Sequence, residues 1–210
     1  QLIGKISALP QDARLDPSFT LTEQLVFYAR LQGFTHQQAV LEASPNAAHL
    51  ALAALEEFFE VVVVTQNIDD LHERAGSSNV IHVHGEILKA RSTADRSLVY
   101  PLTTPELALG DRCELGSQLR PDVVWFGEEV RFIGEAARHF AAATKILAIG
   151  TSLSVYPAAA LVDEARYSAE KYLVAPEAES VPYGYHFIRG NAASVVPHVV
   201  KCWSEGRKPC

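Results

Sequence analysis

The chain has 210 residues, of which 48% are hydrophobic and 20% charged, and its formal net charge is -7 at pH 7. This is the composition of an ordinary globular protein, and a negative charge without a lysine or arginine run argues against a nucleic-acid partner. No apolar stretch approaches the roughly 20 residues of a membrane span, and no signal peptide opens the chain, so we expect a cytoplasmic protein without a membrane partner.

The first half of the chain predicts two helices followed by a buried strand. One helix is expected to begin near Thr20 and to end at Gly33. A second is expected over Ala47–Phe59, with Ser44 as its N-cap and Pro45 at its first helical position. The apolar, β-branched run 61–64 then predicts a strand buried on both faces of a parallel sheet.

The second half predicts further strands that alternate with helices. An irregular excursion is expected between Ser92 and Gln118, where proline and glycine interrupt every pattern. The other expected elements are strands over Val80–His84, Val123–Gly127, Lys145–Ile149, Lys171–Val174 and Tyr185–Ile188, and helices over Glu135–Ala143, Tyr156–Arg166 and Ala192–Cys202. This alternation predicts an α/β fold with a doubly wound, Rossmann-like parallel sheet and a small helical or irregular lobe.

Polar side chains follow two of the predicted strands directly. Gln66, Asn67 and Asp69 come after the strand over 61–64, where an open α/β sheet binds its ligands. Asn67 and Asp69 share a face of an extended segment, and their donor and acceptor groups suit a carboxamide such as nicotinamide. Either residue alone is better explained by an Asx-turn, but the three together favour a ligand site.

The next predicted strand ends in histidine. His84 precedes Gly85, and His82 should share its side of the strand. An imidazole can act as a general base near neutral pH, and the glycine leaves room for a substrate. A hydrogen-bonded structural histidine explains the pattern equally well.

Two further segments could bind ligands. Gly150, Thr151 and Ser152 lie between a predicted strand and a helix, where a ribose or phosphate could bind, although such hydroxyls more often cap the helix. Trp125 and Phe126 could wall an apolar slot at a strand edge that pairs with a peptide, although aromatic strands usually belong to the core.

Several blocks, taken in order, resemble the sirtuins, the NAD-dependent protein-lysine deacylases. The blocks are Thr65–Asp69 with Leu71–Gly76, Val83–Gly85, Leu119–Glu128 and Gly150–Ala158, together with Pro45–His49 and Ile188–Ala192. The resemblance covers roughly residues 19–200. It implies one sirtuin-like domain over residues 1–210, with a small irregular subdomain at about 92–118 and a helical segment at about 20–58.

The resemblance also implies roles for individual residues. Gln66, Asn67 and Asp69 would hold the nicotinamide and its ribose, His84 would be the general base, and Asn67 would assist catalysis. The acyl-lysine oxygen would attack the ribose, nicotinamide would leave, and the acyl group would pass to ADP-ribose. The residues implied at the adenosine half of NAD are Gly150, Thr151, Ser152, Gly190, Asn191 and Ala192. Those implied at the acyl-lysine peptide are Val123, Val124, Trp125, Phe126, Gly127 and Glu128.

The chain departs from the family pattern in three places. The family's zinc module uses four cysteines, whereas this stretch contains only Cys113 and has Ser92 where the first pair would begin, so we expect a zinc-less member with no metal. The family's glycine-rich phosphate loop has only a faint counterpart in Gly4–Ala8. Members selective for acidic acyl groups carry Tyr and, three residues later, Arg; here Arg30 follows Tyr28 by two, so both are candidate substrate residues and the acyl preference stays open.

Three functions remain open at this stage. The first is the NAD-dependent deacylase, which the joint presence of His84, Asn67 and Asp69 favours. The second is a non-catalytic module that binds NAD or ADP-ribose. The third is an NAD hydrolase that uses water in place of a peptide.

Overall fold

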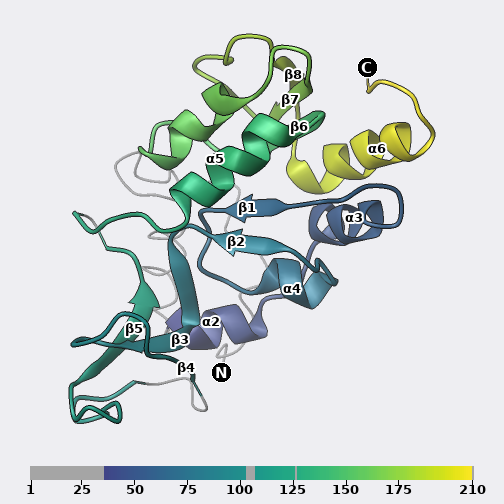
Figure 1. Ribbon diagram of the computed structural model, residues 1–210. Helices are drawn as coiled ribbons and strands as arrows, with labels where there is room; N and C mark the ends of the chain where they lie inside the picture. The colour runs from purple at the N-terminus through teal and green to yellow at the C-terminus, as the bar shows by residue number, and fades with distance from the viewer. Residues whose placement is uncertain (1–35, 103–106, 126, 210) are drawn as a thin grey trace. The chain divides into compact units, whose positions relative to one another are not determined.

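The computed structural model describes residues 36–102, 107–125 and 127–209 (Figure 1). The chain divides into two compact units, one of residues 1–43 and 87–122 and the other of residues 44–86 and 123–210. The helix expected near Thr20 lies outside the described residues. Among the residues described, no helix combines the length and the apolar character needed to cross a membrane.

The unit of residues 44–86 and 123–210 is built on parallel strands. β1 (Val63–Thr65) pairs with β2 (Val80–His82), and β7 (Glu170–Ala175) lies between β6 (Lys145–Ile149) and β8 (His186–Arg189). These strands confirm the α/β class with parallel sheets. The described residues form separate ladders of two and three strands, where the sequence predicted one continuous sheet.

Helices of this unit pack against the strands and against one another. They are α3 (Ala47–Leu55), α4 (Leu71–Ala75), α5 (Ile133–Ala142), the 3₁₀ helix η1 (Ala158–Glu164) and α6 (Ala192–Ser204). Helices α3 and α6 lie side by side (Figure 1) and share a core with β7. The buried members of that core are Ala48, Leu55, Tyr172, Val174, Val196, Val199, Val200 and Trp203.

Two of the predicted helices were wrong in their extent, and the first of them, α3, ends at Leu55 and not at Phe59. The N-cap of α3 is Asn46, not Ser44, because the Asn46 side chain accepts hydrogen bonds from the backbone N–H groups of Ala48 (2.9 Å) and His49 (3.3 Å). The helix expected over 156–166 is the shorter 3₁₀ helix η1. The N–H of Ala160 bonds to the carbonyl of Pro157, the three-residue spacing of that helix type.

The described part of the other unit contains α2 (His36–Glu42) and most of an antiparallel sheet. Its strand order is β4 (Val99–Pro101), β3 (Gly85–Ser92) and β5 (Leu119–Val123). The prediction of an irregular excursion from 92 to 118 therefore missed β4. The strand expected over Val123–Gly127 was wrong as well, because β5 ends at Val123, the only described residue of that range that lies in a strand. Pro121 lacks a backbone donor and is tolerated in β5 because that strand lies at an edge of the sheet.

Candidate active site

The loop after β1 carries the predicted nicotinamide residues, and two local hydrogen bonds shape it. The backbone N–H of Asn67 donates to the Thr65 hydroxyl (3.0 Å), which closes the strand end. The Asp69 carboxylate accepts from the N–H of Leu71 (3.1 Å), which begins α4. The Asx-turn expected for Asp69 alone is therefore present, so this carboxylate has a structural role in addition to any role in binding.

The His84 side chain forms a hydrogen bond with a backbone carbonyl of the same loop. Its ring Nδ1 lies 3.1 Å from the carbonyl oxygen of Gln66. A carbonyl oxygen can only accept a hydrogen bond, so Nδ1 must carry the proton. In the neutral ring the lone pair then lies on Nε2, which has no hydrogen-bond partner within the described part of the chain. The tautomer that can take up a proton at Nε2 is thus fixed by the fold.

Two histidines lie beside Asp69. The rings of His49, from α3, and His72, from α4, have centroids 4.7 Å apart. Burial lowers the pKa of each below the usual 6.5, while the charge of Asp69 acts in the opposite direction. Both rings are therefore mainly neutral at pH 7. Neither histidine has a predicted role in the site, because nothing in the sequence places the two together.

The turns that follow β6 and β8 flank one edge of the three-stranded sheet. The N–H of Gly150 donates to the carbonyl of Val174 (2.9 Å), and that of Gly190 to the carbonyl of Ala175 (3.0 Å). Both acceptors lie at the carboxyl end of β7. The two turns predicted to bind the adenosine half are therefore brought to the same edge by their shared neighbour.

The side chains in these turns are partly engaged in local structure. Thr151 accepts a hydrogen bond from the N–H of Leu153 (3.1 Å), and the Ser152 hydroxyl bonds to that of Ser154 (2.5 Å). Asn191 caps α6 by accepting from the N–H of Ala193 (2.9 Å). The N-terminus of this 13-residue helix, which begins at Ala192, supplies the partial positive charge that favours an anion.

The predicted peptide segment is connected to His84. The backbone N–H of Val124 donates to the His84 carbonyl (2.9 Å), and the N–H of Trp125 donates to the Glu128 carboxylate (3.1 Å). The Trp125 side chain is 60% exposed, and Gly127 has a φ of 85°, which favours glycine. Trp125 is thus available at the surface and is not a core residue.

Some predicted site residues cannot be placed. Phe126, Tyr28, Arg30 and the segment Gly4–Ala8 lie outside the described residues. The described hydrogen bonds join Gln66, His84 and Val124 in one group and the two glycine turns in another.

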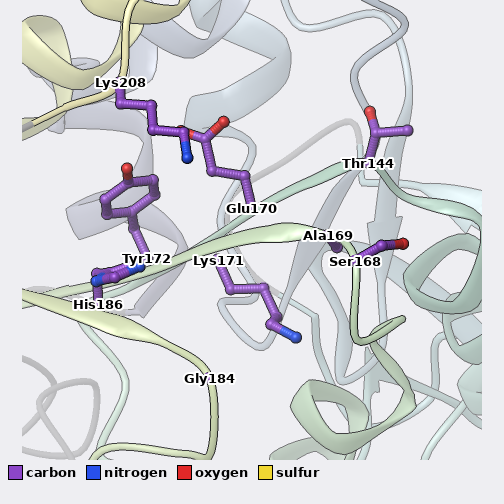
Figure 2. A pocket seen from close by; sticks show the side chains of 9 residues that line it. All are labelled: Thr144, Ser168, Ala169, Glu170, Lys171, Tyr172, Gly184, His186 and Lys208. Carbon is purple, nitrogen blue, oxygen red and sulfur yellow. The ribbon is translucent and has the colours of Figure 1, made fainter.

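A pocket of about 350 Å³ lies elsewhere, at the amino ends of β6 and β7 (Figure 2). It is lined by Thr144, Ser168, Ala169, Glu170, Lys171, Tyr172, Gly184, His186 and Lys208. None of these was predicted as a site residue. The Lys171 ammonium donates to the carbonyl of Arg166 (2.9 Å), so this cation supports the chain locally.

A polar cluster occupies the stretch where a zinc module was considered. The thiol of Cys113, which is 7% exposed, lies 3.3 Å from the hydroxyl of Ser92 and 3.0 Å from that of Ser117. The two hydroxyls bond to each other at 2.8 Å. These hydrogen bonds, that of Ser117 foremost, lower the pKa of the Cys113 thiol to about 7. Two serine hydroxyls and one cysteine thiol therefore hydrogen-bond to one another in this part of the chain.

Comparison with known proteins identifies one family. Residues 9–157 match the Sir2 family. The chain is 46% identical over 158 residues to an NAD-dependent protein deacylase of Helicobacter pylori (strain J99 / ATCC 700824), covering 74% of this chain and 67% of that protein. The solved structure of a Sir2 homolog–NAD complex superposes with a TM-score of 0.72 at 33% identity, covering 88% of this chain and 73% of that one.

A Sir2 protein bound to acetylated peptide also matches, with a TM-score of 0.67, 29% identity, and coverage of 88% of this chain and 79% of that one. The chain spans about two thirds of the length of the curated relatives that it matches, with 67%, 62% and 64% for three of them. With most of its length matched by the family model and this level of identity to its relatives, the chain belongs to the Sir2 family.

Proposed function

We propose that this chain removes acyl groups from lysine side chains of proteins, with NAD as the acceptor of the acyl group and with release of nicotinamide. The observation that carries the proposal is the hydrogen bond from His84 Nδ1 to the Gln66 carbonyl. This bond holds the His84 ring, with its proton-accepting Nε2, against the loop that carries Asn67 and Asp69. Family membership supports the reaction, and the geometry supports the assignment of residues.

The residues present fit NAD. The carboxamide of nicotinamide both donates and accepts hydrogen bonds, as do the side chains of Gln66 and Asn67, and Asp69 adds an acceptor. The turns at Gly150 and Gly190, with the N-terminus of α6, suit the ribose and phosphate groups of the other half. When bound, NAD supplies the ribose carbon that reacts with the acyl oxygen.

The protein's own residues would then divide the work. His84 takes up a proton from a ribose hydroxyl at Nε2, while the Gln66 carbonyl holds its ring. Asn67 orients the nicotinamide amide, with its own backbone fixed by Thr65. The exposed Trp125 covers the acyl-lysine side chain and excludes water from the reacting groups.

The acyl-lysine peptide is proposed to bind along residues 123–128. The hydrogen bond from Val124 to the His84 carbonyl holds this segment next to the base. An acyl-lysine whose backbone pairs with this segment would therefore reach the base directly. We also propose that both units belong to one Sir2-type domain, with a small subdomain at about 92–118 and a helical segment at about 20–58. Each unit is made of two separate stretches of chain, so neither can be removed as one continuous piece.

Nicotinamide release is expected when the protein is incubated with NAD and an acyl-lysine peptide. Acetyl-, succinyl- and malonyl-lysine peptides should be compared, with nicotinamide and deacylated peptide both quantified by mass spectrometry. Equal amounts of the two products support the proposal. Release without any peptide would identify an NAD hydrolase instead. Binding of ADP-ribose in calorimetry without release from any peptide would identify a non-catalytic module.

We further propose that this member holds no structural zinc. A structural site needs four ligands, commonly thiolates, and Cys113 is neighboured by two serine hydroxyls that already bond to each other and to its sulfur. Metal analysis of the purified protein is expected to find far less than one zinc per chain. The Cys113→Ser variant should give the same low metal content. A stoichiometric zinc content that disappears in that variant would contradict the proposal.

A further inference from the structure

Two histidines of one short segment hold consecutive carbonyl groups of the catalytic loop. His84 Nδ1 bonds to the Gln66 carbonyl, and His82 Nδ1 lies 3.3 Å from the Asn67 carbonyl. The pairing of β1 with β2 aligns Thr65 with His82, which brings both rings to the loop. Of the two rings, only that of His82 has a second partner among the described residues.

That second partner is a carboxylate. His82 Nε2 lies 2.7 Å from Oε1 of Glu73, on the first turn of α4. A carbonyl oxygen and an ionised carboxylate can each only accept, so both ring nitrogens of His82 must donate. His82 itself is 7% exposed, so its ring has little contact with water, although the Glu73 side chain is 40% exposed. The geometry therefore requires an imidazolium, in contrast to the neutral ring that His84 needs as a base.

The negative charges around His82 also favour its protonated form. Burial by itself would lower the pKa of His82, but the hydrogen bond and charge of Glu73, with the charge of Glu86 from β3, raise it above 6.5. The nearby His72 of α4 is a neutral ring for the most part. Burial would raise the pKa of Glu73, but its hydrogen bond to His82 lowers it below 4.5.

We propose, on the basis of the function proposed above, that His82 and Glu73 form a positioning pair that fixes the Asn67 carbonyl and so holds the nicotinamide loop for catalysis. The pair connects β2, the loop and α4 in one chain of hydrogen bonds. Loss of the His82 proton leaves a lone pair facing the Glu73 carboxylate, and the ring can no longer satisfy both partners. The loop then keeps its hydrogen bonds to Thr65 and His84 and the one from Leu71 to Asp69, without the bond to His82.

The pair also makes the loop sensitive to pH in a defined direction. Because the pKa of His82 is raised in the folded protein, its contribution to the stability of the loop is complete below pH 6.5. That contribution is lost as the pH rises through the higher pKa of the folded state. Because the pKa of Glu73 is lowered, its contribution to the stability of the loop is complete above pH 4.5 and is lost as the pH falls through the lower pKa of the folded state. Between these values both groups are charged, and the loop is held most firmly.

A divalent cation is a weaker explanation for the same side chains. One ligand atom from each of Glu73, His82 and Glu86 lies within 4.8 Å of the others. However, the 2.7 Å contact between His82 Nε2 and Glu73 already satisfies the nitrogen that would bind a metal. All measurements below should therefore be repeated with a chelator, and a result that changes on chelation would favour the cation and overturn the positioning pair.

The decisive experiment is the pH profile of nicotinamide release with NAD varied. The wild-type rate at low NAD is expected to fall on the alkaline side as His82 loses its proton. Glu73→Gln should move the midpoint of that fall to lower pH by about one unit. Glu86→Gln is the matched control, because it removes a charge that acts on His82 only through space, and it should move the midpoint less. Equal shifts, or none, would contradict the proposal.

The side chain of His82 gives a rescue test. His82→Ala should lower the rate at low NAD by about tenfold or more, as expected for the loss of a charge-assisted hydrogen bond. His82→Gln can still donate to the Asn67 carbonyl and should recover part of that loss, without the alkaline fall. Equal rates for the two variants, or an alkaline fall that persists in both, would overturn the proposed role.

A third measurement needs no activity and so separates this proposal from the proposed function. Hydrogen exchange at the amides of Asn67 and Leu71, which bond to Thr65 and Asp69, reports on the loop itself. Exchange should be several-fold faster in Glu73→Gln than in Glu86→Gln. The His82 ring should titrate by NMR with a pKa above 6.5. Unchanged exchange, or a midpoint at or below 6.5, would overturn the pair even in a protein that releases no nicotinamide.

Discussion

Replacing His84 with alanine is expected to lower the rate of nicotinamide release in the presence of acyl-lysine peptide by about 10²–10⁴-fold, the usual contribution of a general base. The change removes Nε2, the atom that would take up the ribose proton, and with it the hydrogen bond to the Gln66 carbonyl. The ring is only half-buried, so the fold should persist. Single-turnover rates at saturating NAD and peptide give the cleanest comparison, because they exclude product release.

The control for this variant is His139→Ala, on α5, since that histidine has no part in the proposed site. Its rate should stay within about twofold of wild type, as for most substitutions away from a functional site. Circular dichroism and the melting temperature of both variants should match those of the wild type. An H84A protein that is folded and retains the wild-type rate would remove His84 from the catalytic role.

Gly190→Ala is expected to destabilise the fold and to weaken the binding of ADP-ribose. A Cβ at this position would lie 2.5 Å from Cγ2 of Val195, on the first turns of α6, so the turn after β8 must shift. Inserting one methyl group into such a contact lowers the free energy of unfolding by about 1–3 kcal/mol. The same turn donates to Ala175 and precedes the N-cap Asn191, so its displacement should also reduce ligand affinity. Urea denaturation and calorimetry with ADP-ribose measure the two effects.

A second substitution tests the cause. Val195→Ala removes the atom that the new methyl group would meet, so G190A should cost less in the V195A background than in the wild type. The double-mutant cycle isolates this coupling from the separate cost of shortening a core valine. Additive effects of the two changes would show that the contact with Val195 is not the reason for any loss.

Strands bounded by clear signals could be predicted closely. β6 occupies Lys145–Ile149 as expected, because five residues that are mainly apolar end at a glycine. α6 begins at Ala192 as expected and runs two residues beyond the prediction, since Cys202 and Trp203 are both buried and continue its apolar face. Residues with strong local preferences thus formed the expected elements.

Elements that depend on distant partners were missed. β3 is an eight-residue strand, but its mixture of charged and apolar residues gives no clear period, and it is stabilised by pairing with β4 and β5 on either side. The cap of α3 was misplaced because Ser44, Pro45 and Asn46 are all good helix-start residues, and only the observed hydrogen bonds distinguish them.

The amino-acid sequence by itself determined the α/β class, the family, and the residue types available at the ends of the parallel strands. It placed Gln66, Asn67, Asp69 and His84 near one another because polar residues that follow buried parallel strands collect at one edge of a sheet. Only the tertiary structure decided which ring nitrogens of His82 and His84 donate a hydrogen bond. That depends on carbonyl and carboxylate partners nine to eighteen residues away, and the register of β1 against β2 brings them within hydrogen-bonding distance.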